Sequence, residues 1–313
     1  MGTATFVLWL LGLILLCAGC SPTVPETKPD VTQTLTPLGE QSIPRVSATP
    51  QHTPTEPIRL TPTPTPEPTP AVTLTIVYDN QAYEPELQGD WGFACLIERG
   101  TDTVLFDTGA SGALLLDNLA HLGHTPHEID AVILSHAHGD HTGGLTALLD
   151  AGAAPTVYLP ATFPEAFKRQ IEARVPLVQV SEPGEMRPGF FSTGPLGTAI
   201  PEQALAMQTP AGLVIVTGCA HPGVDLLAQQ ALVTTGNTEA TLLLGGFHLS
   251  GASTQEVDRI ITALQALGVQ RVAPCHCTGT QAQRRFAAAY GTDYHSVGAG
   301  WTLTLTSEPE AGP

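Results

Sequence analysis

The chain has 313 residues, of which 42% are apolar and only 13% are charged, and its formal net charge is −17. This length suits two average domains, or one large domain with segments that form no core. The acidic balance lacks the basic surface that binding to phosphate backbones requires, so we expect no nucleic-acid partner. Of the 28 prolines, 13 lie between Ser21 and Pro70, which indicates that the chain is not one uniform globule.

The first twenty residues have the pattern of an export signal. An apolar run, Phe6–Leu16, is too short for a comfortable membrane span and suits the core of a signal peptide, which we assign to residues 1–20. Ala18 and Gly19 before Cys20 resemble the lipobox of bacterial lipoproteins, which implies cleavage before Cys20 and lipidation of its thiol. An uncleaved anchor is the alternative. Both interpretations predict an extracytoplasmic protein tethered to the cell membrane.

Residues 21–72 are rich in Pro and Thr and end in TPTPTPEPTP. Such a composition cannot bury enough apolar surface to offset the entropy of ordering the backbone. It predicts a disordered, extended spacer. Residues 307–313 are predicted to be a disordered tail. Residues 73–306 are then one folded domain, and residues 73–313 contain most of the negative charge, with 24 acidic and nine basic residues.

Apolar runs and helical periodicity in residues 73–306 predict a mixture of strands and helices. The predicted strands are Val72–Tyr78, Phe93–Ile97, Thr103–Phe106, Ala131–Leu134, Leu213–Val216, Thr241–Leu244, Arg271–Ala273 and Trp301–Leu305. The predicted helices are Gly112–Leu122, Gly143–Ala151, Thr162–Arg174, Val224–Leu232, Thr254–Leu267 and Thr280–Tyr290. A strand meander followed by alternating strands and helices predicts an α/β fold of stacked sheets with helices outside.

The segment SHAHGDHTGG, residues 135–144, directly follows the predicted strand AVIL. In extended chain, His136 and His138 point the same way and can bind one cation. Asp140 and His141, at the start of the next helix, can face a second cation. Imidazole and carboxylate ligands suit Zn²⁺, and also Fe or Mn. The alternative is a solvated histidine-rich turn, but this ligand spacing is specific enough that we predict a metal site.

The pattern His-x-His-x-Asp-His after an apolar strand resembles the signature of the metallo-β-lactamase superfamily. That resemblance implies an αββα sandwich, in which Asp107 of the segment LFDTG supports the ligand loop through hydrogen bonds. Three downstream segments, TGCAHPG, GGFHL and PCHCTG, together with DWGF, resemble the subfamily named for dihydropterin–ribofuranosylaminobenzene phosphate synthase. The resemblance spans roughly residues 79–300. Thr278, in the last segment, is predicted to support the site or to act as a ligand.

The superfamily pattern also implies the remaining ligands. His221 would complete the His136/His138 site, and His276 would complete the Asp140/His141 site. The superfamily usually adds a bridging Asp between those two histidines, but this chain has no acidic residue at such a strand end. Cys219 and His248 are the candidates for that place. Cys219 is alternatively a small buried residue, and His248 is alternatively a proton donor or an anion-binding group.

A site of this kind predicts an enzyme that binds one or two divalent ions, Zn²⁺ or else Fe, Mn or Mg. Metal-activated water predicts hydrolysis of a small-molecule ester, lactone, thioester, amide or phosphoester, with Asp140 and His248 as catalytic residues. Two alternatives stay open: the transferase activity for which the subfamily is named, and a ligand-sensing domain without catalysis. Export argues against the first alternative because the substrates of cofactor biosynthesis are cytoplasmic.

Overall fold

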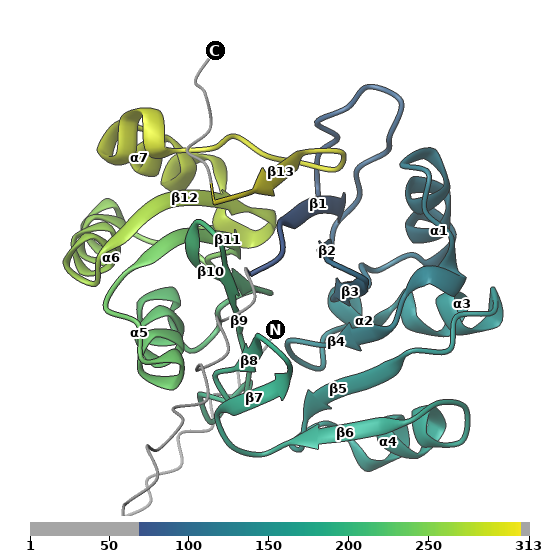
Figure 1. The fold of residues 1–313 in the computed structure, drawn as a ribbon. Coiled ribbons are helices and arrows are strands. Elements are labelled where there is room, and N and C mark those ends of the chain that lie inside the picture. Colours follow the sequence, from purple (N-terminus) through teal and green to yellow (C-terminus); the bar gives the residue numbers. More distant parts are fainter. Residues whose placement is uncertain (1–68, 308–313) are drawn as a thin grey trace, which may run out of the picture. The chain divides into compact units, whose positions relative to one another are not determined.

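The computed structural model describes residues 69–307. The predicted signal peptide, Cys20, nearly all of the predicted spacer and most of the tail lie outside the described residues. Two sheets face each other in the described part (Figure 1). The first has the order β13-β1-β2-β3-β4-β5-β6. Its strands are β1 (Val72–Tyr78), β2 (Ala94–Arg99), β3 (Asp102–Phe106), β4 (Ala131–Ile133), β5 (Thr156–Pro160), β6 (Leu177–Val180) and β13 (Thr302–Leu305).

The second sheet has the order β12-β11-β10-β9-β8-β7. Its strands are β7 (Gly184–Arg187), β8 (Phe190–Ser192), β9 (Leu205–Thr209), β10 (Gly212–Thr217), β11 (Ala240–Gly246) and β12 (Val269–Cys275). In the first sheet, β3, β4, β5 and β6 pair in parallel, and in the second, β10, β11 and β12 do so. Parallel strands place their carboxyl ends along one edge of a sheet, where open α/β sheets bind ligands.

Helices cover the outer face of each sheet, so the layers run helix, sheet, sheet, helix (Figure 1). The helices are α1 (Gly112–His121), α2 (Gly139–Thr142), α3 (Leu145–Asp150), α4 (Glu165–Glu172), α5 (Val224–Thr235), α6 (Thr254–Ala266) and α7 (Thr280–Tyr290). Short 3₁₀ turns lie at Pro126–Glu128, His276–Thr278 and Gly291–Asp293. Apolar clusters join α1, α3 and α4 to the first sheet and α5, α6 and α7 to the second.

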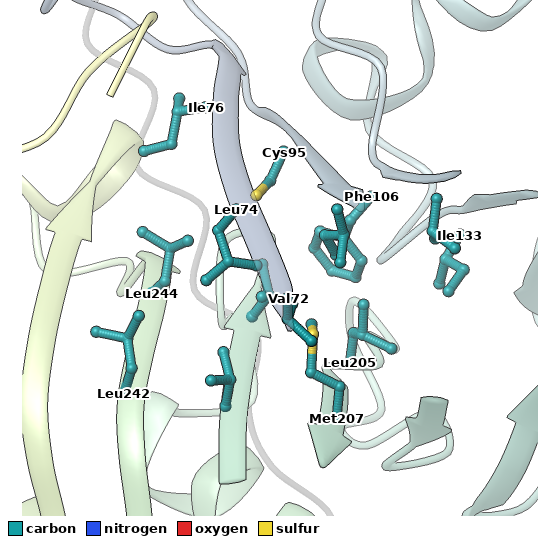
Figure 2. Close-up of a cluster of buried hydrophobic side chains, with 14 of the residues drawn as sticks. Val72, Leu74, Ile76, Cys95, Phe106, Ile133, Leu205, Met207, Leu242 and Leu244 are labelled. Carbon is teal, nitrogen blue, oxygen red and sulfur yellow. The ribbon is translucent and has the colours of Figure 1, made fainter. Parts of the chain in front are cut away.

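The core between the sheets consists of the inward side chains of both (Figure 2). Leu74 and Phe106 of the first sheet and Leu205 and Leu244 of the second are fully buried in it. Because each sheet also has an apolar outer face, the strands are buried on both sides and read as nearly continuous apolar runs. This architecture is the predicted αββα sandwich.

All eight predicted strands and all six predicted helices are present, with ends that differ by a few residues. The prediction missed β5, β6, β7, β8 and β9. Periodicity is weak in three of them: β8 has only three residues, the middle of β6 is exposed, and β7 (GEMR) has no apolar alternation. These strands form in the context of neighbouring strands rather than from their own sequence. Within residues 69–307, no helix is long and apolar enough to cross a membrane.

Candidate metal centre

The predicted ligands meet where parallel strands of both sheets end. Ser135–His141 follows β4, the segment with Cys219 and His221 follows β10, His248 follows β11, and His276 follows β12. Backbone strain concentrates at the same place. Among described residues other than glycine, positive φ occurs only at Asp107, Ala220, His248 and His276. Such conformations cost on the order of 1–3 kcal/mol each and cluster at functional sites.

The first group of donors is His136, His138 and His221, whose ligand atoms all lie within 4.8 Å of one another. His136 Nε2 lies 3.0 Å from His138 Nδ1. Burial, and then the neighbouring imidazoles and above all His141, lower the pKa of His136 to about 2. His136 is therefore neutral at physiological pH and offers a lone pair rather than a charge.

The second group is Asp140, His141, Cys219 and His276. Cys219 Sγ lies 3.3 Å from His141 Nε2, and Asp140 Oδ2 lies 3.5 Å from His276 Nε2. Burial favours the neutral acid at Asp140, but the neighbouring imidazoles of His276 and His141 outweigh it and hold the pKa of Asp140 well below its usual range. Cys219, one of the two candidates for the missing bridging aspartate, lies among these ligands and also within reach of His221 and His248.

Hydrogen bonds fix the orientation of four imidazoles. The Ser135 hydroxyl donates to Asp107 Oδ2 at 2.7 Å, so its oxygen accepts from His136 Nδ1 at 2.9 Å. His141 Nδ1 donates to the same Asp107 oxygen at 2.7 Å. His221 Nδ1 donates to Glu202 Oε2 at 2.8 Å. In each case the outer nitrogen carries the proton, and Nε2 faces the other ligands with its lone pair.

His276 follows the same rule. Its Nδ1 donates to Asn80 Oδ1 at 3.0 Å, while Asn80 Nδ2 donates to the backbone oxygen of His276. Asp79 accepts from the His276 backbone nitrogen at 2.9 Å. The inner nitrogen, His276 Nε2, is buried and has no hydrogen-bond partner. A buried imidazole nitrogen left unpaired is costly unless a ligand completes it.

These residues fit divalent cations. Lone pairs of neutral imidazoles converge at about the distance of a hydrogen bond in the first group, and an unpaired nitrogen, a carboxylate and a thiol converge in the second. A cation would complete the unpaired His276 nitrogen and give the converging donors a common partner. Imidazole, carboxylate and thiol are the ligand types of Zn²⁺, and His with carboxylate also suits Fe and Mn.

The hydrogen bonds of Asp107 agree with the supporting role that we expected for it. Asp107 is fully buried and accepts from the Ser135 backbone and hydroxyl as well as from His141. Gly218 makes this approach feasible: a Cβ there would lie 2.1 Å from Ser135 Oγ. Thr278 lies in neither donor group. Its hydroxyl donates to Cys275 O and accepts from Phe247 N, so it joins the ends of β11 and β12.

His248 lies at the rim and forms a third group with Cys219 and His221. Its ring centroid is 4.4 Å from that of His221. The hydrogen bond with Cys277 raises the pKa of His248. An exposed imidazole with a raised pKa suits a proton donor more than a ligand. The four described cysteines, Cys95, Cys219, Cys275 and Cys277, are free and buried.

Sequence reasoning missed Glu202, which is fully buried. Its carboxylate accepts from the backbone nitrogens of Cys219, Ala220 and His221 and from the His221 ring, at 2.8–2.9 Å. Burial alone would raise its pKa, but the bond with His221 and the remaining partners lower the pKa of Glu202 to about 2. One signal existed: Glu202 is the only Asp, Glu, Lys or Arg between Arg187 and Asp225.

Trp91 lies in the segment DWGF, but no role was predicted for it from the sequence. Its Nε1 donates to Asp140 Oδ2 at 2.7 Å. The other histidines lie outside the donor groups. His121 and His124 are on or after α1 and contact Asp117 and Glu128, and His127 lies beside Gly152. The His295 ring centroid is 5.8 Å from that of Trp301, and His295 joins no group of possible ligands in the described part.

Comparisons with known proteins agree with this geometry. The sequence model of the metallo-beta-lactamase superfamily matches residues 92–224. The 7,8-dihydropterin-6-methyl-4-(beta-D-ribofuranosyl)-aminobenzene-5'-phosphate synthase of Methanocaldococcus jannaschii is 28% identical over 275 residues, 72% of this chain and 94% of that protein.

Two solved structures share the fold. The structure of Tm1679, described as a metal-dependent hydrolase of the beta-lactamase superfamily, has a TM-score of 0.63 and 28% identity, and the match covers 74% of this chain and 98% of Tm1679. The metallo-beta-lactamase fold protein YhfI of Bacillus subtilis has a TM-score of 0.55 at 15% identity, over 75% and 99% of the two chains.

Proposed function

We propose that the described part of this chain is a domain of the metallo-β-lactamase superfamily and that the protein is a metal-dependent hydrolase of a small-molecule ester, lactone or phosphoester. The observation that carries this proposal is the pair of adjacent donor groups, with His136, His138 and His221 in one and Asp140, His141, Cys219 and His276 in the other. Bound divalent cations would supply Lewis-acid chemistry, which lowers the pKa of water and polarises the bond under attack.

The chain's own residues support the rest of such a reaction. Trp91 fixes Asp140, and the low pKa of Asp140 keeps it ionised, so it can orient a water molecule or accept its proton. His248, which is exposed beside His221 and has a raised pKa, can give a proton to the leaving group. Asp107 and Glu202 hold the ligating rings in place.

A screen of the purified full chain tests this proposal. Generic esters, lactones and phosphodiesters would be assayed before and after treatment with a chelator, beside the His136→Ala variant. We expect turnover that the chelator abolishes, that added Zn²⁺, Mn²⁺ or Fe²⁺ restores, and that His136→Ala lacks. Turnover that survives both chelator and substitution would refute the proposal.

The second candidate is a synthase activity, favoured by one observation: the match to the methanopterin-pathway synthase spans 94% of that protein. It predicts that the chain joins a dihydropterin to a phosphorylated arylamine riboside. Product formation from these two substrates, without ester hydrolysis, would favour it. A ligand-sensing domain is the third candidate and predicts tight binding of a small molecule with no turnover of either kind.

We further propose that the protein is exported and anchored to the membrane through a lipid on Cys20, with a spacer over residues 21–72. The apolar run Phe6–Leu16, Ala18 and Gly19 before Cys20, and the proline-rich composition support this. Metabolic labelling with a fatty acid tests it. We expect label on the wild-type chain and none on Cys20→Ala; equal labelling of both would contradict the proposal.

A further inference from the structure

A cavity of about 180 Å³ opens beside the second donor group. Trp91 and His276 form the wall nearest the donors, and Ser250, Thr280, Gln283 and Tyr294 contribute to the remainder. The volume suits one six-membered ring, since an apolar cavity of about 150 Å³ holds benzene. A group bound there would lie directly against the residues proposed to hold a cation, so the cavity is a candidate for part of the substrate.

Trp91 is an unusual wall for such a cavity. Its side chain is 54% exposed, and only one other exposed large aromatic residue, Tyr83, occurs in the described part. Yet Trp91 is not free to move: its indole N–H donates to Asp140 Oδ2 at 2.7 Å, and its ring centroid lies 4.9 Å from that of His276. An aromatic face held rigid and left open to solvent is a surface on which a flat group stacks.

The chemistry of the other walls indicates what kind of group fits. None of the described residues that line the cavity is Lys or Arg, and Asp79 is buried among them. A free anion would therefore meet a carboxylate and no cationic side chain. Gln283 donates through Nε2 to Pro274 O at 3.1 Å, which fixes its amide and leaves the acceptor oxygen for a ligand. Hydroxyls of Ser250, Thr280 and Tyr294 add donors and acceptors without charge.

We propose that this cavity binds an uncharged, planar part of the substrate, an aromatic ring with an amide-like substituent, stacked on Trp91 and hydrogen-bonded to Gln283. This inference rests on the proposed function, because it assigns one part of the substrate to a cavity beside the same site. Trp91 then has two roles: it positions Asp140 through its N–H, and it selects flat neutral groups through its ring.

Three matched probes test the inference by calorimetric titration of the full chain: benzamide (planar and neutral), cyclohexanecarboxamide (neutral but not planar) and benzoate (planar but anionic). Inorganic phosphate is a fourth. We expect saturable binding of benzamide and about two- to tenfold weaker binding of cyclohexanecarboxamide, since aromatic pairs contribute about 0.5–1.5 kcal/mol beyond their burial. Benzoate and phosphate should bind the chelator-treated protein more weakly than benzamide does, because Asp79 lines the cavity and none of its described lining residues is Lys or Arg. Comparable or tighter binding of benzoate or phosphate to the chelator-treated protein, in which no bound cation attracts anions, would overturn the proposal.

Variants separate the stacking from general damage to the fold. We expect Trp91→Leu and Gln283→Ala each to weaken benzamide binding about two- to tenfold, and Trp91→Phe, which keeps a ring, to weaken it less than Trp91→Leu does. Tyr83→Leu removes the other exposed aromatic ring, which does not line the cavity, and should leave binding unchanged. Equal binding by wild type and Trp91→Leu would refute the role of Trp91.

The titration is run on both metal-loaded and chelator-treated protein, so the two proposals fail separately. Selective benzamide binding without any metal-dependent turnover would support the subsite and refute the hydrolase. Metal-dependent turnover in a protein that does not bind benzamide would support the hydrolase and refute the subsite.

Discussion

Glu202→Gln is the substitution that probes the supporting framework of the site most sharply. The carboxylate accepts four hydrogen bonds, from the backbone nitrogens of Cys219, Ala220 and His221 and from the His221 ring. A glutamine amide has one oxygen, and its NH₂ group would face donors instead of accepting from them. Buried donors that lose a partner cost about 1–3 kcal/mol each.

The lowered pKa of Glu202 is a second, independent indication of how much this residue stabilises the folded protein. Its fall from an ordinary 4.5 to about 2 corresponds to about 3 kcal/mol of stabilisation of the folded protein at neutral pH. Because Glu202 binds fewer protons when folded than when unfolded, this contribution is fully present above about pH 4.5 and disappears as the pH falls toward 2. The penalty of Glu202→Gln should therefore be largest at pH 7 and shrink in acid.

Urea unfolding of the metal-free full chain, followed by circular dichroism, measures this penalty. We expect Glu202→Gln to lower the free energy of unfolding by about 3 kcal/mol at neutral pH and by clearly less at pH 3. Affinity for Zn²⁺ should also fall about 10–100-fold, because His221 loses its anchor. Glu172→Gln, at an exposed position on α4, is the control. A loss below about 1 kcal/mol with unchanged zinc affinity would refute this reasoning.

Three further substitutions test other parts of the site. Asp107→Asn, which tolerates the φ of 58°, should fold but bind zinc about 10–100-fold more weakly by chelator competition; unchanged affinity would count against the support of His141. Cys219→Ala should lower the zinc content, whereas Cys95→Ala, a buried thiol elsewhere in the core, should not; equal zinc content in both would exclude Cys219 as a ligand. Gly218→Ala should destabilise the fold by about 1–3 kcal/mol in urea unfolding, because its Cβ would collide with Ser135; full stability would contradict this.

The metal ligands could be predicted from the sequence where residue types that bind metals directly follow a predicted strand. Closely spaced donors such as His136, His138, Asp140 and His141 follow one strand, and His221 and His276 follow others, so strand ends alone suggest that they meet. Glu202 and Trp91 leave no such pattern. Their roles depend on contacts between the β8–β9 connection and the segment after β10, and between the β1–β2 connection and the segment after β4, which bring together residues distant in sequence.

The same limit applies to the fold. Strands β1, β10 and β11 are buried on both faces and are visible as apolar runs. By contrast, β6 and β7 lie at the ends of their sheets, where exposed side chains give no periodic signal, and pairing with a neighbour defines them as strands.

Equilibrium binding of zinc to the metal-free full chain tests the central claim most directly. Two donor groups that share one edge of the sandwich predict two bound ions for each chain. His136→Ala should abolish one of them and His276→Ala the other. Fewer than two ions bound to the wild-type chain, or a stoichiometry that neither substitution changes, would contradict the account.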